Sequence, residues 1–324
     1  MDIRNRKVLK QTAGQYLQSA AYSPKKLVLL HRGLIAVLSL VISLLSLALA
    51  EGIATTGGLS GIGTRNILQT AQMVLEIAQL ILVPFWQIGI LFAFLCIVRN
   101  RPAGPQQLLR GFQRFFPALR LMIIQTLLFT VIGFIIAYIS SFFTILVMPD
   151  LVEQLTPLAM EMMQNPAMDP TAMIEALPQE SLMTMTIWML SIFAVLYGIC
   201  AGFLSLEMRF ANYLILDDPQ MGAIQAIIHS FRFNHGNFWA MIRLDLSFWF
   251  YYVLQGLALS ISMLQLFTPA FHLPIPEQVT SLLIYVVYAL AVLGIDWCFR
   301  PKVEATYALA YDILKTEKFP TKTA

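Results

Sequence analysis

The sequence predicts an all-α, polytopic membrane protein with six transmembrane helices. Apolar residues make up 58% of the 324 residues and charged residues only 12%, whereas a soluble domain carries about 25% charged residues. Six long stretches contain no Asp, Glu, Lys or Arg, and a helix needs about 20 mostly apolar residues to cross a bilayer. None of these stretches alternates apolar and polar residues with period two, so no strands are expected.

The six predicted spans belong to one integral membrane domain that covers residues 1–324. The fifth apolar stretch is too long for a single span, and Pro269, Pro274 and Pro276 are expected to end its helix near Leu266. In chain order, the predicted spans are about residues 33–51, 77–98, 121–147, 184–206, 244–266 and 278–297.

The positions of the basic residues predict the orientation of the chain. Of the 21 Lys and Arg residues, all but Arg65 lie in the N-terminal segment, the second connection, the fourth connection or the C-terminal tail. Because basic connections stay in the cytoplasm, both termini are expected there. The Met-rich connection at residues 148–183 is then an extracytoplasmic loop.

Three segments with helical apolar spacing precede the odd-numbered spans, at Arg6–Leu17, Gln106–Phe116 and Pro219–Phe233. In the third, Asp218 is expected to cap the helix and Pro219 to take its first position. Its predicted apolar side consists of Ile224, Ile227, Ile228 and Phe231. Such amphipathic helices either lie flat in the lipid headgroup layer or cover the cytoplasmic mouth of the bundle, and both interpretations remain open here.

A polar stripe follows the second span. Gln72, Glu76, Gln79 and Gln87 fall within a narrow arc at 100° per residue. Amide groups need hydrogen-bond partners inside a bilayer, so this side should face protein or water. The stripe is either a candidate substrate path or a set of interhelical hydrogen bonds.

Charged residues gather where several predicted spans end on the cytoplasmic side. If these ends converge, the residues line a charged inner vestibule; otherwise each pairs locally or meets lipid headgroups. The candidate vestibule residues are Glu207, Arg209, Arg243, Asp245, Asp296 and Arg300.

The sequence offers no support for an enzyme, a cofactor, a metal site or a nucleic-acid partner. The four histidines are scattered outside known hydrolase motifs. The three cysteines, Cys96, Cys200 and Cys298, lie inside or at the edge of spans without Cys-x-x-Cys spacing. We therefore expect no catalytic residues.

The chain resembles an uncharacterised family of bacterial integral membrane proteins, domain of unknown function number 975. The resemblance rests on the runs Tyr213–Pro219, Gly236–Trp239 and Leu244–Phe248, and on Glu304-Ala305-Thr306-Tyr307 ahead of Tyr311. The membrane domain attached to some glycerophosphodiester phosphodiesterases has similar architecture. The resemblance implies a bacterial cytoplasmic (inner) membrane and no assigned activity.

The stripe and the inner charges together favour a transport-related protein. This would be a permease-like or export-accessory bundle for an amphiphilic peptide or lipid. The alternative is a non-transporting scaffold that organises lipid or recruits partners through its surface helices. Expected partners are anionic lipids of the inner leaflet and a separate ATPase subunit or other membrane protein.

Overall fold

A computed structural model describes residues 3–55, 62–147, 156, 160, 179–264 and 277–318. Within these ranges the regular structure is helical and contains no strand, which confirms the predicted all-α class. Most of the predicted loop at 148–183 and the segment with Pro269, Pro274 and Pro276 lie outside the described residues.

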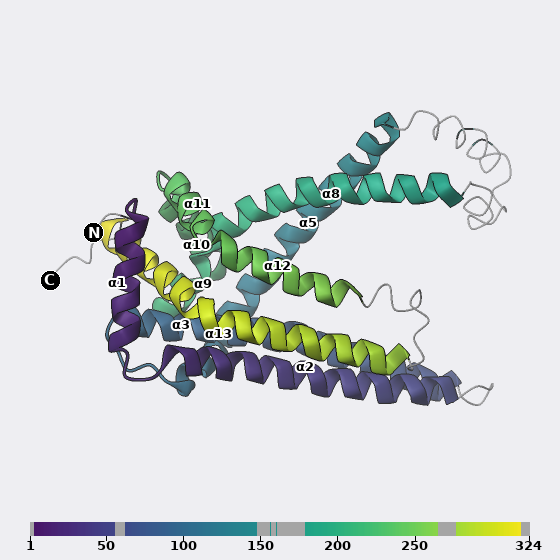
Figure 1. Cartoon of the computed structure of the whole chain (residues 1–324), viewed down its shortest axis with the longest axis horizontal. Coiled ribbons are helices and arrows are strands. Elements are labelled where there is room, and N and C mark those ends of the chain that lie inside the picture. Colours follow the sequence, from purple (N-terminus) through teal and green to yellow (C-terminus); the bar gives the residue numbers. More distant parts are fainter. Residues whose placement is uncertain are drawn as a thin grey trace. The chain divides into compact units, whose positions relative to one another are not determined.

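The chain divides into two compact units. The first combines Met1–Met122 with Met208–Ala324, and the second is Ile123–Glu207. In the first unit, helices α2, α3, α12 and α13 pack along one another (Figure 1). In the second unit, Ser141 of α5 contacts Met189 of α8. The single membrane domain stays a prediction.

Among the described residues, five helices are long and apolar enough to cross a membrane, or six if the bent pair of α11 and α12 is counted as one span. These helices are longer than the predicted spans because their polar flanking residues continue the helix. Their bounds are Pro24–Thr55 for α2, Ile62–Val98 for α3, Phe115–Val147 for α5, Gln179–Met208 for α8 and Glu277–Lys318 for α13.

The last helix departs most from its predicted span at 278–297. It runs for 42 residues, about 63 Å at 1.5 Å per residue. Pro301 lies inside it and removes the backbone hydrogen bond to the carbonyl group of Trp297. The helix nevertheless continues because its last part, which includes Ala305, Ala308 and Tyr311, is buried against other helices.

The helix expected for the fifth span at 244–266 is broken near its start. The chain forms α11 (Phe238–Leu246) and α12 (Trp249–Met263), which meet at 63°. Lys10, from the first helix of the chain, donates a 2.7 Å hydrogen bond to the carbonyl oxygen of Ser247 at this break. Its ammonium also lies 3.8 Å from the centre of the Phe248 ring. A cation is favourable at a helix C-terminus, so Lys10 stabilises the end of α11.

The first segment predicted to form a surface helix, Arg6–Leu17, is helical and belongs to α1 (Arg6–Ser19). The second is not one helix over 106–116. It is a short 3-10 helix, η2 (Pro105–Leu109), followed by α4 (Arg110–Gln113), and Phe115 already belongs to α5. Arg114 has non-helical backbone angles, which separate α4 from α5.

The third surface helix begins later than predicted. Asp218 and Pro219 do not start it, because Asp218 ends α9 (Ala211–Asp217) and its carboxylate accepts a hydrogen bond from the backbone N–H of Gln220. The helix, α10, runs over Ala223–Asn234 with Gly222 at its N-cap.

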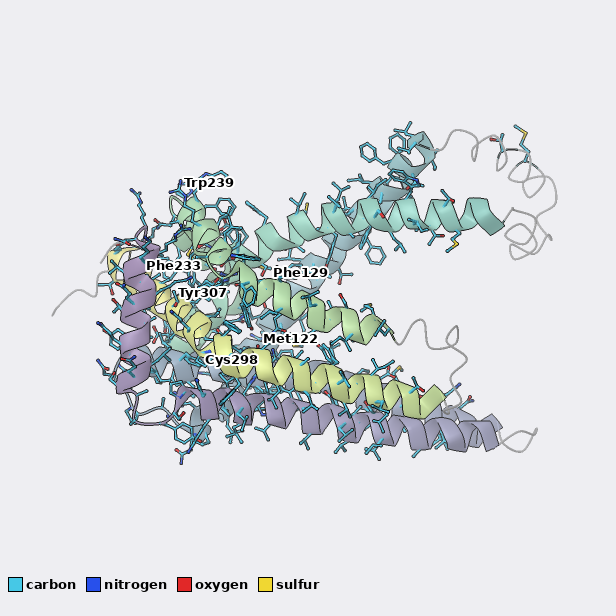
Figure 2. The ribbon with its side chains drawn as sticks, in the orientation of Figure 1. Met122, Phe129, Phe233, Trp239, Cys298 and Tyr307 are labelled. Carbon is cyan, nitrogen blue, oxygen red and sulfur yellow. The ribbon has the colours of Figure 1, made fainter. Side chains whose placement is uncertain are left out.

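The short helices α1, α9, α10 and α11 and residues 302–318 of α13 form a layer at one end of the first unit, which we call the end layer (Figure 1). Its core contains the rings of Phe210, Tyr213, Phe233 and Tyr311, with Tyr213 and Tyr311 stacked at 5.2 Å. The view with side chains places Phe233 and Tyr307 at this end (Figure 2).

α10 turns a different side toward this core than the sequence predicted. Of the four predicted apolar residues, only Ile227 is buried, whereas Ile224, Ile228 and Phe231 are exposed. The buried side instead carries smaller residues and one ring: Ala223, Ala226, Ser230 and Phe233. The helix is therefore apolar on two sides, and only one of them packs.

Two glycines allow α3 to approach η2 and α4 closely. A Cβ atom at Gly89 would lie 2.0 Å from the carbonyl oxygen of Leu108, and one at Gly111 would lie 2.2 Å from that of Phe85. The adjoining core contains Phe85, stacked on the Phe115 ring at 4.8 Å. Only glycine fits at either position without moving the backbone.

We expect Gly89→Ala and Gly111→Ala to destabilise the protein by about 1–3 kcal/mol each, because the backbone must shift to relieve the overlap. Thermal unfolding in mild detergent measures this. Gly33→Ala on α2 is the matched control, since nothing lies within 4 Å of its Cβ position. If Gly111→Ala unfolds no earlier than Gly33→Ala, the close approach is wrong.

Candidate functional site

Three groups of charged and polar side chains lie in succession along α13, from residue 296 to residue 315. We name each one after a carboxylate that it contains: the Asp296 cluster, the Asp245 cluster and the Asp217 cluster. Each joins α13 to helices that are distant in the sequence.

The Asp296 cluster surrounds a carboxylate that has no exposed surface. One oxygen of Asp296 accepts hydrogen bonds from Tyr251 at 2.9 Å and Gln255 at 2.6 Å, both on α12. The other accepts from Arg32 on α2 and from Arg300, one turn further along α13, at 3.1 Å. A buried carboxylate is tolerated only when its oxygens are paired in this way.

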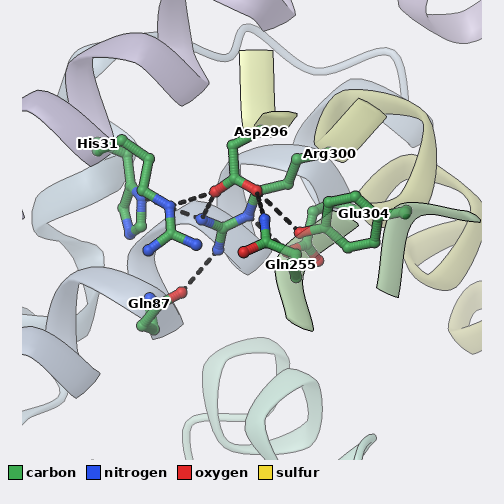
Figure 3. Close-up of polar contacts among 8 residues, drawn as sticks. His31, Gln87, Gln255, Asp296, Arg300 and Glu304 are labelled. Atoms are coloured by element: carbon green, nitrogen blue, oxygen red, sulfur yellow. Dashed lines mark hydrogen bonds and ion pairs between the residues drawn. The ribbon is translucent and has the colours of Figure 1, made fainter. Parts of the chain in front are cut away.

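Arg300 extends the cluster to a fourth helix (Figure 3). Its guanidinium donates to Glu304 at 3.0 Å and to the side-chain oxygen of Gln87 on α3 at 2.6 Å. It also lies 3.4 Å from a ring nitrogen of His31. With two arginines and two carboxylates, the cluster is electrically balanced.

The Asp245 cluster lies further along α13. Arg209 donates two parallel hydrogen bonds to Asp245, at 2.5 and 2.9 Å, the bidentate geometry that makes such pairs specific. Tyr307 of α13 donates to the same carboxylate, and the Arg209 guanidinium lies 4.2 Å from the centre of its ring. Tyr252 of α12 completes the group, 3.0 Å from the Tyr307 hydroxyl.

The Asp217 cluster ties the end of α3 to the end of α13. Arg99 donates two hydrogen bonds to Asp217, at 2.5 and 2.9 Å, and a third to Asp312 at 2.7 Å. Asp217 also accepts from Lys315 at 2.6 Å and Tyr311 at 3.1 Å. Burial lowers the pKa of Arg99, but its hydrogen bonds to the two carboxylates outweigh that effect and raise the pKa overall.

These contacts define the relative directions of three helices. Gln87 pairs with Arg300 and Arg99 pairs with Asp312. Twelve residues, or about 18 Å, therefore separate these two contacts along α3 and along α13 alike. Helices α3 and α13 are therefore parallel. The links from Arg32 to Asp296 and from Ala36 to Tyr285 show that α2 runs antiparallel to α13.

Four of the predicted vestibule residues lie in two of these clusters. Asp296 and Arg300 form an ion pair in one, and Arg209 and Asp245 form an ion pair in the other. Arg243 is exposed and Glu207 is buried. The vestibule itself stays a prediction.

The predicted path residues make contacts of three kinds. Gln72 donates to Glu76 on the same helix at 3.3 Å, and Gln79 donates to Ser39 on α2 at 3.0 Å. Gln87 instead belongs to the Asp296 cluster. Gln79 and Gln87 thus both make interhelical hydrogen bonds, and the substrate path stays a prediction.

An apolar groove of about 720 Å³ lies between α2 and α3. It is lined by Leu45 and by one side of α3 that includes Ile67, Ala71 and Val74. At 100° per residue this side is roughly opposite to Gln72 and Glu76. The groove therefore does not continue the polar stripe.

Most partners in the clusters were missed by reasoning from the sequence. Two signals pointed to some of them: Asp217 lies in the run Tyr213–Pro219, and Glu304 and Tyr307 lie in the run Glu-Ala-Thr-Tyr. Nothing in the local sequence indicates that Arg32 or Arg99 pairs with a carboxylate on a distant helix. In the part of the chain that the structure describes, no group of three or more His, Cys, Asp or Glu side chains is suited to a metal ion.

Asp296→Asn should destabilise the protein by about 3–5 kcal/mol, because it leaves the buried Arg300 and its neighbour Arg32 without their shared counter-charge. Unfolding in SDS, followed by circular dichroism, gives the free energy. Arg243→Gln, which removes an exposed charge, is the control and should change stability little. Equal stability of both variants would contradict the assigned role of Asp296.

Arg99 and Asp217 should be energetically coupled. Arg99→Gln, Asp217→Asn and the double variant form a cycle, for which we expect a coupling energy of about 1–3 kcal/mol. The same cycle with Asp217→Asn and Arg243→Gln should be additive, since Arg243 is exposed and takes no part in the Asp217 cluster. An additive result for Arg99 as well would show that the bidentate pair does not form.

Comparison with known proteins agrees with the resemblance in the sequence. Residues 5–293 match a family described as "Protein of unknown function (DUF975)". No curated protein and no solved structure gives a significant match. The family match covers most of the chain. It includes Arg99 and Asp217 of the Asp217 cluster and the whole of α12. The chain therefore belongs to the DUF975 family.

Proposed function

We propose that this protein is a multi-pass membrane scaffold with both termini in the cytoplasm and the end layer held as a fixed platform at the inner surface. The observation that carries the proposal is the succession of ion-paired clusters along α13. They join the apolar helices to the end layer through hydrogen bonds of 2.5–2.9 Å at both Arg99 and Arg209.

Placement in a membrane is supported by apolar side chains that no described residue covers. In the second unit, Tyr138 is 80% exposed and Phe134 73% exposed. Exposed apolar surface on this scale is typical of contact with lipid or a partner. The distribution of basic residues supports a cytoplasmic location for both ends.

The length of α13 supports the position of the end layer. Lys302 follows Leu282 by 20 residues, about 30 Å of helix, which equals the thickness of the hydrocarbon core. Residues 303–318 would then lie beyond the lipid tails. The exposed Trp249 and Trp297 lie near the same level, where tryptophan is enriched at the membrane surface.

Saturation of the inner charges favours a scaffold over a path. A conducting vestibule needs groups that are free to bind and release a substrate, whereas Arg209, Asp245, Asp296 and Arg300 each bind another side chain. Such pairs are costly to break once they are buried, so the helices that they join are held in one arrangement.

The platform has a surface that suits recruitment. Ile224, Ile228 and Phe231 form an exposed apolar stripe on α10 with helical spacing. Trp239 on α11 is 71% exposed (Figure 2). These side chains are not required for packing within the end layer, which leaves them available for a lipid surface or a partner protein.

The second candidate is the transport-related bundle for an amphiphilic peptide or lipid, working with a separate ATPase subunit. Two observations favour it: the stripe of Gln72, Glu76 and Gln79, and the apolar groove on the opposite side of α3. The two functions predict different environments for Gln79: a transport path would expose it to water, whereas a scaffold would not.

Thiol labelling separates the two functions without knowledge of a substrate. In a background with Cys96, Cys200 and Cys298 replaced by Ala, an impermeant thiol reagent should label Gln72→Cys and Glu76→Cys from outside intact cells. Gln79→Cys should stay unlabelled, because it packs against Ser39 away from water and a thiol reacts only as the hydrated thiolate. Lys7→Cys should be labelled only after permeabilisation.

Rapid labelling of Gln79→Cys, at a rate close to that of Gln72→Cys, would instead support a water-filled path and the transport function. Labelling of Lys7→Cys in intact cells would overturn the proposed orientation. Protein amount and elution profile of each variant serve as the control for folding.

A further inference from the structure

Three cations converge where α1 packs against α13. Arg6 and Lys10 are four residues apart on α1, which places them on the same side of that helix. Lys302 lies on α13, which packs against α1, and its charge acts on Lys10 across that contact. Arg6 and Lys302 are exposed, and neither makes an ion pair with a residue that the structure describes.

Lys10 is held firmly at the centre of this group. Its ammonium donates to the Ser247 carbonyl at 2.7 Å and lies over the Phe248 ring at 3.8 Å. Burial lowers the pKa of Lys10, and the charges of Lys302 and Arg6 lower it further. The three cations repel one another, so an anion bound among them would stabilise the arrangement.

The position of these three cations along α13 indicates which kind of anion they bind. Lys302 lies about 30 Å along α13 from Leu282, at the end of one hydrocarbon thickness. Trp249 directly follows Phe248, and Lys25 lies 5.0 Å from the centre of the Trp297 ring. Exposed tryptophans beside cations are typical of the layer that holds the phosphate groups of phospholipids.

We propose that Arg6, Lys10 and Lys302 bind the phosphate group of an anionic phospholipid of the inner leaflet. Lys10 supplies a fixed donor, while Arg6 and Lys302 supply charge from two different helices. The bound lipid would fasten α1 to α13 beside the break between α11 and α12. This inference rests on the membrane placement given in the proposed function, and it adds a ligand and a site to it.

The test is native mass spectrometry of the full chain in mild detergent, titrated with phosphatidylglycerol or with phosphatidylcholine. Each basic residue near such a surface contributes about a fivefold change in affinity. Arg6→Gln and Lys302→Gln should each weaken binding of the first phosphatidylglycerol about fivefold. Lys302→Arg, which keeps the charge, should bind like the wild type, as should Lys7→Gln, which removes an exposed charge from the same helix.

Several outcomes would overturn the site. Equal loss for Lys7→Gln and Lys302→Gln would mean that lipid is attracted by total charge alone. Equal binding of phosphatidylcholine would remove the role of the anion. Inorganic phosphate that displaces phosphatidylglycerol at millimolar concentration would assign the site to a free phosphate. None of these results depends on the thiol labelling, so a failure here is distinct from a failure of the proposed orientation.

Discussion

A carboxylate with no exposed surface is the constraint around which the first unit is built. Asp296 needs donors for both of its oxygens, and α13 supplies only Arg300. The remaining donors come from α2 and α12, through Arg32, Tyr251 and Gln255. An unpaired charge in this position would be costly. The three helices therefore take the relative arrangement in which both oxygens of Asp296 have donors.

The other clusters follow from the position of α13. Once Arg300 meets Gln87, parallel α3 and α13 bring Arg99 beside Asp312 about 18 Å further on. Arg99 in turn holds Asp217 at the end of α9. The end layer is thus positioned by charged contacts as well as by its aromatic core, which explains how small helices such as α9 keep a fixed place at the end of long apolar ones.

The sequence predicted well what depends on local composition. Stretches free of charge located all of the long helices, and the basic residues gave a consistent orientation that awaits a test. Prediction from the sequence failed where contacts join residues that are far apart in the chain. The break at Ser247 depends on Lys10, 237 positions away, and the paired state of Arg99 depends on Asp217. The face of α10 was misjudged because large apolar residues such as Ile224 lie outside, while small ones such as Ala226 fit against the rings within.

The order of the helices along the chain has a consequence for folding. Arg32, Gln87 and Tyr251 all precede their partners on α13 in the sequence. The Asp296 cluster can therefore form only after α13 has been synthesised, so α2, α3 and α12 reach their final contacts late.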